Sequence, residues 1–102
     1  MSKHSDTIDC LVNRLLTKGY EIILKEKVYG MKIRGGIKRG EFDVLGIKGE
    51  RAVYFEVKSN DTKKGYGKAL VQFRRASPVI KRMGYRPCFV YVTPTKVLRV
   101  RF

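Results

Sequence analysis

Asp43, Glu56 and Lys58 combine two carboxylates with an amine within one short segment of the chain. Two carboxylates held side by side repel each other and raise each other's pKa unless a cation lies between them, and their hard oxygen atoms suit Mg²⁺ or Mn²⁺. Such a metal polarises a phosphoryl oxygen and lowers the pKa of its bound water. A nearby lysine could orient that water or stabilise charge on a phosphate. The three residues therefore indicate metal-dependent hydrolysis of a phosphate ester, provided that the fold brings them together.

The segment from Gly40 to Ser59 predicts an antiparallel hairpin that would do so. It contains two apolar stretches, Glu41 to Ile47 and Ala52 to Val57, which we interpret as strands. A short polar turn separates them, and Gly49 is the first residue of its two-residue loop. This turn fixes the register of the two strands.

In that register Asp43 lies opposite Glu56, and Glu41 lies opposite Lys58. Side chains alternate along a strand, so all four would share one face of the sheet, with directly opposed Cβ atoms roughly 5 Å apart. Three carboxylates and a lysine are thus expected to converge on one patch.

The other positions of the hairpin are apolar on both faces. Phe42, Val44, Phe55 and Val57 would lie together on the face opposite the charged patch, and Leu45, Ile47, Ala52 and Tyr54 would complete the charged face. Strands that are apolar on both sides are usually central and covered on both faces. Acidic residues at the ends of such strands are costly to bury unless something binds them. A solvated edge hairpin without any activity is the plainer alternative.

Asp43 followed after a gap by Glu56-Val57-Lys58 resembles the D…ExK core of the PD-(D/E)xK nuclease superfamily. The resemblance implies that Asp43, Glu56 and the Val57 carbonyl are metal ligands for Mg²⁺ or Mn²⁺, and that Lys58 is the catalytic lysine. Phe42 occupies the position of the motif's proline, a position that varies in the superfamily. The resemblance also implies a restriction-endonuclease-like α/β fold, in which helices flank a mixed central β-sheet.

The rest of the sequence predicts the elements that would position this hairpin, in the order α-β-β-β-α-β-β within a single domain of residues 1–102. They are a helix over Asp6 to Lys18, a strand over Tyr20 to Tyr29, a helical region that begins with the polar run Ser59 to Gly67, and strands over Pro87 to Thr93 and Lys96 to Phe102. Ser77-Pro78 is expected to kink the second helical region or to start a short helix that ends at Met83.

Two further residues are candidates for the site because of the resemblance. Many such nucleases carry an acidic residue on the first helix that joins the metal site, which implies Asp9; a favourable charge at a helix N-terminus explains the same residue without a metal. A basic or glutamine residue of the second helix often reaches the scissile phosphate, which implies Gln72 or Lys68. Both could equally be ordinary surface residues.

Basic residues gather at two places near the predicted site. The glycine-rich run Gly30 to Gly40 carries Lys32, Arg34, Lys38 and Arg39, and we interpret it as a mobile loop that contacts DNA, although an ordinary flexible hairpin loop would look alike. The second helical region carries Lys63, Lys64, Lys68 and Arg75, which are further candidates for DNA contacts.

The chain has 23 lysine and arginine residues against 9 acidic ones, a net charge of +14. Such an excess favours a polyanionic partner, nucleic acid first and an anionic membrane surface second. No apolar run approaches the roughly 20 residues that span a bilayer, and no signal peptide is evident, so we expect an intracellular protein, cytoplasmic, nucleoid-associated or virus-encoded. Cys10 and Cys88 lack metal-ligand spacing and are interpreted as reduced, buried thiols.

Within the superfamily, the small size and the order of elements resemble the archaeal Holliday junction resolvases. Shared features include Lys18-Gly19-Tyr20 at the end of the first helix and Arg74-Arg75 in the second. The resemblance implies a homodimer that cuts four-way DNA junctions in recombination and repair. Two alternatives remain, a nuclease of the same fold that acts on other DNA structures and a basic nucleic-acid-binding protein without catalytic activity.

Overall fold

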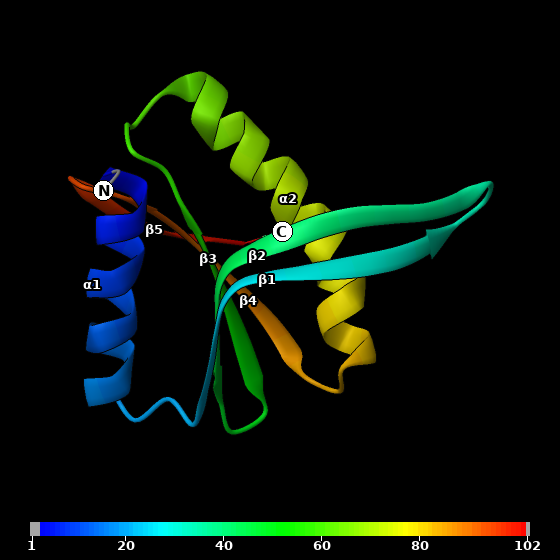
Figure 1. The fold of residues 1–102 in the computed structure, drawn as a ribbon, viewed down its shortest axis with the longest axis horizontal. Coiled ribbons are helices and arrows are strands. Elements are labelled where there is room, and N and C mark those ends of the chain that lie inside the picture. Colours follow the sequence, from blue (N-terminus) through cyan, green and yellow to red (C-terminus); the bar gives the residue numbers. More distant parts are fainter. Residues whose placement is uncertain (1–2, 102) are drawn as a thin grey trace.

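A computed structural model describes residues 3–101 of the chain (Figure 1). The elements are α1 (Lys3–Thr17), β1 (Ile22–Ile33), β2 (Gly36–Lys48), β3 (Arg51–Val57), α2 (Lys63–Arg82), β4 (Arg86–Thr93) and β5 (Lys96–Val100). In this part of the chain the five strands form one sheet in the order β1-β2-β3-β4-β5. β3 and β4 are parallel, and the other neighbours are antiparallel. The expected α/β fold with a mixed sheet and flanking helices is confirmed.

The two helices cover opposite faces of the sheet (Figure 1). On one face, Ile8 and Leu15 of α1 pack against the side chains of Val44, Phe55 and Val57. On the other face, α2 buries Ala69, Phe73, Ala76 and Ile80 against a larger cluster that includes Tyr54, Phe89 and Tyr91. The middle of β2 and most of β3 are therefore buried between these two layers.

The predicted hairpin of β2 and β3 has the expected turn and register. Lys48 pairs with Arg51 across the turn, and Gly49 has a φ of 60°, in the left-handed region that favours glycine. Farther along, Val44 pairs with Phe55, and the ladder ends at this pair. The next predicted pair, Asp43 with Glu56, is not part of the ladder.

One predicted core residue lies on the other face of the sheet. Val44, Phe55 and Val57 are in the cluster under α1, as expected, but Phe42 is in the cluster under α2. The side-chain alternation of β2 is therefore broken at Asp43. Opposite this point on β1, Glu26 has a φ of 52° and is skipped in the β1–β2 register. This local distortion explains why strict alternation gave the wrong face for Phe42.

The interpretation of residues 30–40 as a mobile loop is wrong. β1 and β2 remain paired as far as Ile33 and Gly36, joined by a turn at Arg34 and Gly35, where Gly35 has a φ of 95°. Because β3 pairs only with the other half of β2, this part of the hairpin extends beyond the sheet as a two-stranded arm (Figure 1). We call residues 27–41 the β1–β2 arm.

α2 is a single helix that continues through Ser77-Pro78, so a second short helix starting there, one of the two expected alternatives, is not observed. Pro78 is exposed inside the helix, where its missing N–H removes one hydrogen bond without ending the element. The helix begins after Thr62, whose Oγ1 accepts a hydrogen bond from the Gly65 N–H at 3.0 Å, as an N-cap residue does. In the described part of the chain, no helix is long and apolar enough to cross a bilayer.

Candidate active site

The four residues of the predicted charged face line one cleft. Its lining consists of Val28, Arg39, Gly40, Glu41, Asp43, Glu56, Lys58, Gln72 and Arg75, and its volume is ≈ 390 Å³. The β1–β2 arm, the end of β3 and the middle of α2 each contribute a wall. The structure thus brings together Glu41, Asp43, Glu56 and Lys58, and adds Gln72 and two arginines that the sequence had suggested. We call this feature the acidic cleft.

Asp43 is fixed by the backbone of β3 at the point where the strand ladder ends. Its Oδ2 accepts a hydrogen bond from the Val57 N–H at 2.9 Å, so the carboxylate replaces a strand hydrogen bond. The N–H and C=O of one strand residue point to the same side. The Val57 carbonyl therefore also faces β2, the side on which Asp43 lies.

Glu56 is a buried acid beside a second acid. Its residue is only 5% exposed, and this burial, with the hydrogen bond and the charge of Asp43, raises the pKa of Glu56 from 4.5 to about 8. A hydrogen bond from Tyr54 and the charge of Lys58 oppose the rise. Without a cation in the cleft, the Glu56 carboxyl is thus largely protonated at neutral pH.

Tyr54 orients the Glu56 carboxyl. Its hydroxyl lies 2.8 Å from Glu56 Oε2, to which it donates a hydrogen bond, and 3.1 Å from the Glu41 carbonyl oxygen. The sequence predicted the correct face for Tyr54, but as an apolar residue of the core and without a role for its hydroxyl. Its position two residues before Glu56 could have indicated this role, because residues i and i+2 of a strand have their side chains on the same face.

The donor atoms of the cleft suit a hard divalent cation. Among residues 3–101, no group of three or more histidine, cysteine or acidic side chains is placed to hold a metal. Asp43 and Glu56 supply two carboxylates, and the Val57 carbonyl supplies a third oxygen on the same side of β3. Mg²⁺ commonly binds through one or two carboxylates and keeps several waters. A bound cation would favour the ionised form of Glu56, whose pKa burial and Asp43 raise, so the residues present fit such an ion.

Lys58, which directly follows β3, and Gln72 of α2 both line the cleft. Lys58 is held at the strand end by its N–H, which donates to the Val92 carbonyl at 2.9 Å. The Gln72 Oε1 atom is buried and has no hydrogen-bond partner among the described residues. An unpaired buried oxygen is costly, so Gln72 is suited to accept a hydrogen bond from a ligand or an ordered water.

Asp9 lies outside the acidic cleft. It forms an ion pair with Lys25 of β1, with 3.0 Å between Asp9 Oδ1 and Lys25 Nζ. The structure therefore does not bring Asp9 to the other predicted ligands. Its exposed pairing with a lysine accounts for the residue without a metal.

The predicted DNA-contacting residues fall into two groups. Arg39 and Arg75 line the acidic cleft. Lys32 and Arg34 are exposed on the β1–β2 arm, and Lys63, Lys64 and Lys68 are exposed on the first turns of α2. The side chain of Lys38 lies outside the described residues.

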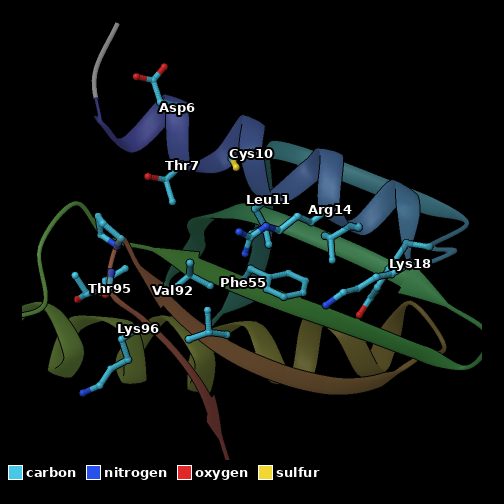
Figure 2. A pocket seen from close by; sticks show the side chains of 15 residues that line it. Asp6, Thr7, Cys10, Leu11, Arg14, Lys18, Phe55, Val92, Thr95 and Lys96 are labelled. Atoms are coloured by element: carbon cyan, nitrogen blue, oxygen red, sulfur yellow. The ribbon is translucent and has the colours of Figure 1, made fainter.

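A larger hollow of ≈ 600 Å³ lies on the opposite face of the sheet, between α1 and the turn that joins β4 to β5. Figure 2 shows Phe55 and Val92 on its floor and Arg14 and Lys18 extending from α1 above them. It contains no pair of neighbouring carboxylates, and its acidic residue, Asp6, is exposed. The chemistry suggested by the sequence therefore belongs to the acidic cleft.

No protein-family model matches the chain, and no curated protein matches it. Among solved structures, one titled "Crystal structure of SSO0001" is similar, with a TM-score of 0.53 and 16% sequence identity. The match covers 93% of this chain and 48% of that chain, so this chain spans about half the length of that protein. At this identity the similarity concerns the fold alone.

Proposed function

We propose that the protein is a metal-dependent endonuclease that hydrolyses phosphodiester bonds in DNA at the acidic cleft. The observation that carries the proposal is the convergence of Asp43, Glu56 and Lys58 in one cleft, with the pKa of Glu56 raised to about 8. Carboxylates are retained there on a protein of net charge +14, although they would repel a phosphate unless a cation bound between them.

Each residue of the cleft has a separate part in this proposal. Asp43, Glu56 and the Val57 carbonyl would hold Mg²⁺ or Mn²⁺, which supplies a Lewis acid and a more acidic water. Tyr54 holds the Glu56 carboxyl in place through its 2.8 Å hydrogen bond. The Lys58 ammonium would contact the phosphate and stabilise the charge that develops on it.

The charge distribution supports DNA as the substrate. Arg39 and Arg75 border the acidic cleft, and guanidinium groups bind phosphate through paired hydrogen bonds. The exposed basic residues of the β1–β2 arm and of α2 extend this surface in two directions from the site. A phosphate chain crossing the cleft would thus contact cations on both sides of the scissile bond.

Beyond the general activity, we propose a restriction-endonuclease-like fold and an activity like that of the archaeal Holliday junction resolvases. The D…ExK resemblance supports both, as does the central position of β2 and β3 in a mixed sheet. A homodimer with two sites on one surface would then make paired cuts. A single domain of this size also covers little duplex alone, since specific protein–DNA interfaces commonly bury about 1,000 Å² or more of protein surface.

Cleavage assays with defined substrates test the proposal. Purified protein is incubated with labelled four-way junctions, linear duplex and single strands, in Mg²⁺, Mn²⁺ or EDTA. We expect metal-dependent cleavage that Glu56→Gln reduces at least roughly 100-fold, as removal of a transition-state contact commonly does. DNA binding should persist, because the substitution leaves Arg39 and Arg75 beside the cleft. Glu50→Gln makes the same change at an exposed turn and should cut at the wild-type rate.

The outcomes separate the candidate functions. Paired, symmetric cuts in the junction alone would support the resolvase activity. Cleavage of other DNA structures would keep the nuclease and reject the junction specificity. Binding without any metal-dependent cleavage would instead indicate a non-catalytic nucleic-acid-binding protein. Equal cutting by Glu56→Gln and wild type would show that the site is assigned to the wrong residues.

A further inference from the structure

A second charged hollow lies at the opposite end of β3 from the acidic cleft. It has a volume of ≈ 370 Å³ and is lined by Arg51, Arg86, Pro87, Cys88, Phe89, Arg99 and Arg101. The four arginines come from the first residues of β3 and β4 and from the end of β5. All four are exposed. We call this feature the arginine hollow.

The arginine hollow faces the α1 side of the sheet, whereas the acidic cleft is bounded by α2. Val53 and Val90 pack against the cluster under α1. Arg51 lies two residues before Val53, and Arg99 is the register partner of Val90, so alternation places both arginines on that face. Arg51 and Glu56 are also separated by roughly 17 Å along β3, at about 3.3 Å per residue. One short stretch of backbone phosphates could not occupy both sites.

The arginines of the hollow repel one another. Arg51 and Arg86 are direct partners in the β3–β4 register, and like charges placed opposite each other destabilise a sheet. Among the described residues, the observed ion pairs join Lys25 with Asp9 and Lys96 with Asp61, and none includes an arginine of the hollow. Within residues 3–101, no observed ion pair therefore neutralises an arginine of the hollow.

We propose that Arg51, Arg86, Arg99 and Arg101 form a second binding site for the phosphate backbone of DNA, on the face of the sheet opposite the acidic cleft. Guanidinium groups match phosphate oxygens in paired hydrogen bonds, and bound phosphates would relieve the repulsion between the arginines. Four guanidiniums spread over three strands suit a chain of phosphates better than a single small anion. The choice of DNA rests on the proposed function, but the site does not depend on cleavage.

This second site implies that the protein holds two separate segments of DNA, one on each face of the sheet. A branched molecule presents such segments as two arms. A linear duplex would have to bend around the sheet edge to reach both sites, and bending a duplex much shorter than its persistence length is unfavourable. We therefore expect the arginine hollow to favour branched over linear DNA.

The slope of log K against log salt reports the number of phosphates that the protein neutralises. Binding of a four-way junction is measured in EDTA at several salt concentrations for wild type, Arg51→Gln/Arg99→Gln and the control Lys81→Gln/Arg82→Gln. The control removes the same charge from exposed positions at the end of α2, outside the hollow. Loss of two contacts should flatten the slope of log K against log salt by about 1.8, which makes binding roughly 60-fold weaker at 0.1 M salt if the affinities are equal at 1 M. Equal effects of the two double variants would overturn the proposal.

Cys88 provides a local reporter because it lines the hollow and is partly exposed. In Cys10→Ser protein, the rate of alkylation of Cys88 by a maleimide should fall in proportion to the fraction of protein bound to junction DNA. In Cys88→Ser protein, alkylation of the exposed Cys10 on α1 should change much less. An unchanged rate of Cys88 alkylation at saturating DNA would overturn the proposal. So would a result in which millimolar inorganic phosphate protects Cys88 from alkylation as well as DNA does, or in which only anionic lipid vesicles protect it.

These experiments separate the two proposals. Neither measurement requires cleavage, since both are made in EDTA. If the protein binds DNA through the arginine hollow but never cuts it, the nuclease proposal is rejected and the second site stands. If Arg51→Gln/Arg99→Gln cuts DNA normally and its salt slope equals that of the control variant, the second site is rejected and the nuclease proposal stands.

Discussion

The protonation of Glu56 should make the metal-free protein less stable as the pH rises. Its pKa in the folded chain is about 8, against an ordinary value of 4.5, because the residue is buried beside Asp43. Between these two pH values the folded protein holds a proton that the unfolded chain has lost. The free energy of unfolding then falls with rising pH. This contribution is complete below about pH 4.5 and is lost as the pH passes through 8.

The size of the effect follows from the shift. At about 1.36 kcal/mol per pH unit, moving from 4.5 to about 8 corresponds to about 5 kcal/mol at most. Natural domains have a total stability of about 5–15 kcal/mol, so the loss would be large enough to measure. Asp43 contributes through its hydrogen bond and charge, but burial is the largest cause. Asp43→Asn should therefore reduce the pH dependence without abolishing it.

Urea unfolding in EDTA at intervals from pH 5 to pH 9 measures this dependence. Glu56→Gln removes the titrating group and keeps the shape, so its stability should lack the decline between pH 5 and pH 8. Glu50→Gln, at an exposed turn, should follow wild type and correct for the charge change. Mg²⁺ should flatten the wild-type curve, because the ion stabilises the ionised carboxylates. If wild type and Glu56→Gln lose stability in parallel, Glu56 does not hold the proton and the argument is refuted.

Substitutions at Asp43, Gly40 and Asp9 test the geometry in and around the site. Asp43→Ala leaves a buried N–H of β3 unpaired and should cost about 1–3 kcal/mol in urea unfolding, whereas Asp43→Asn can still accept that bond and should cost less. Gly40→Ala places a Cβ against the buried Tyr29 ring and should cost about 1–3 kcal/mol, while Gly67→Ala, with open space, should not destabilise α2. Asp9→Asn breaks an exposed ion pair, so it should change stability by no more than about 1 kcal/mol and leave the cleavage rate unchanged; loss of cleavage would place Asp9 in the site.

Local sequence signals were enough to predict the central hairpin. Gly49 in the two-residue loop predicted both the turn and the register of β2 and β3, and the structure agrees with both as far as the pair Val44 and Phe55. Beyond that pair the ladder is not continued, yet Glu41, Asp43, Glu56 and Lys58 still line one cleft. The helical spacing of Gln72 and Arg75 also predicted that these two residues share one face of the second helix.

Features that depend on tertiary contacts were not predictable in the same way. The glycines of residues 30–40 indicate flexibility by composition, yet β1 pairs with β2 along this whole stretch. Pro78 is a helix breaker by propensity, but the helix continues because the neighbouring residues Ala76 and Ile80 are buried in the core. Helix packing also decided the position of Asp9, which the resemblance had placed in the metal site and the structure places beside Lys25.

The break in alternation at Asp43 connects the fold to the site. A regular ladder would have used the Val57 N–H and C=O in pairing with β2, and no backbone oxygen would then face the cleft. Because the strand distorts here, the Asp43 side chain takes the N–H, and the carbonyl is left on the side of the two carboxylates. The same distortion turns Phe42 towards α2, where it packs on Tyr54, the residue that orients Glu56. The irregularity of β2 at Asp43 thus lies where the proposed oxygen donors for a cation come together.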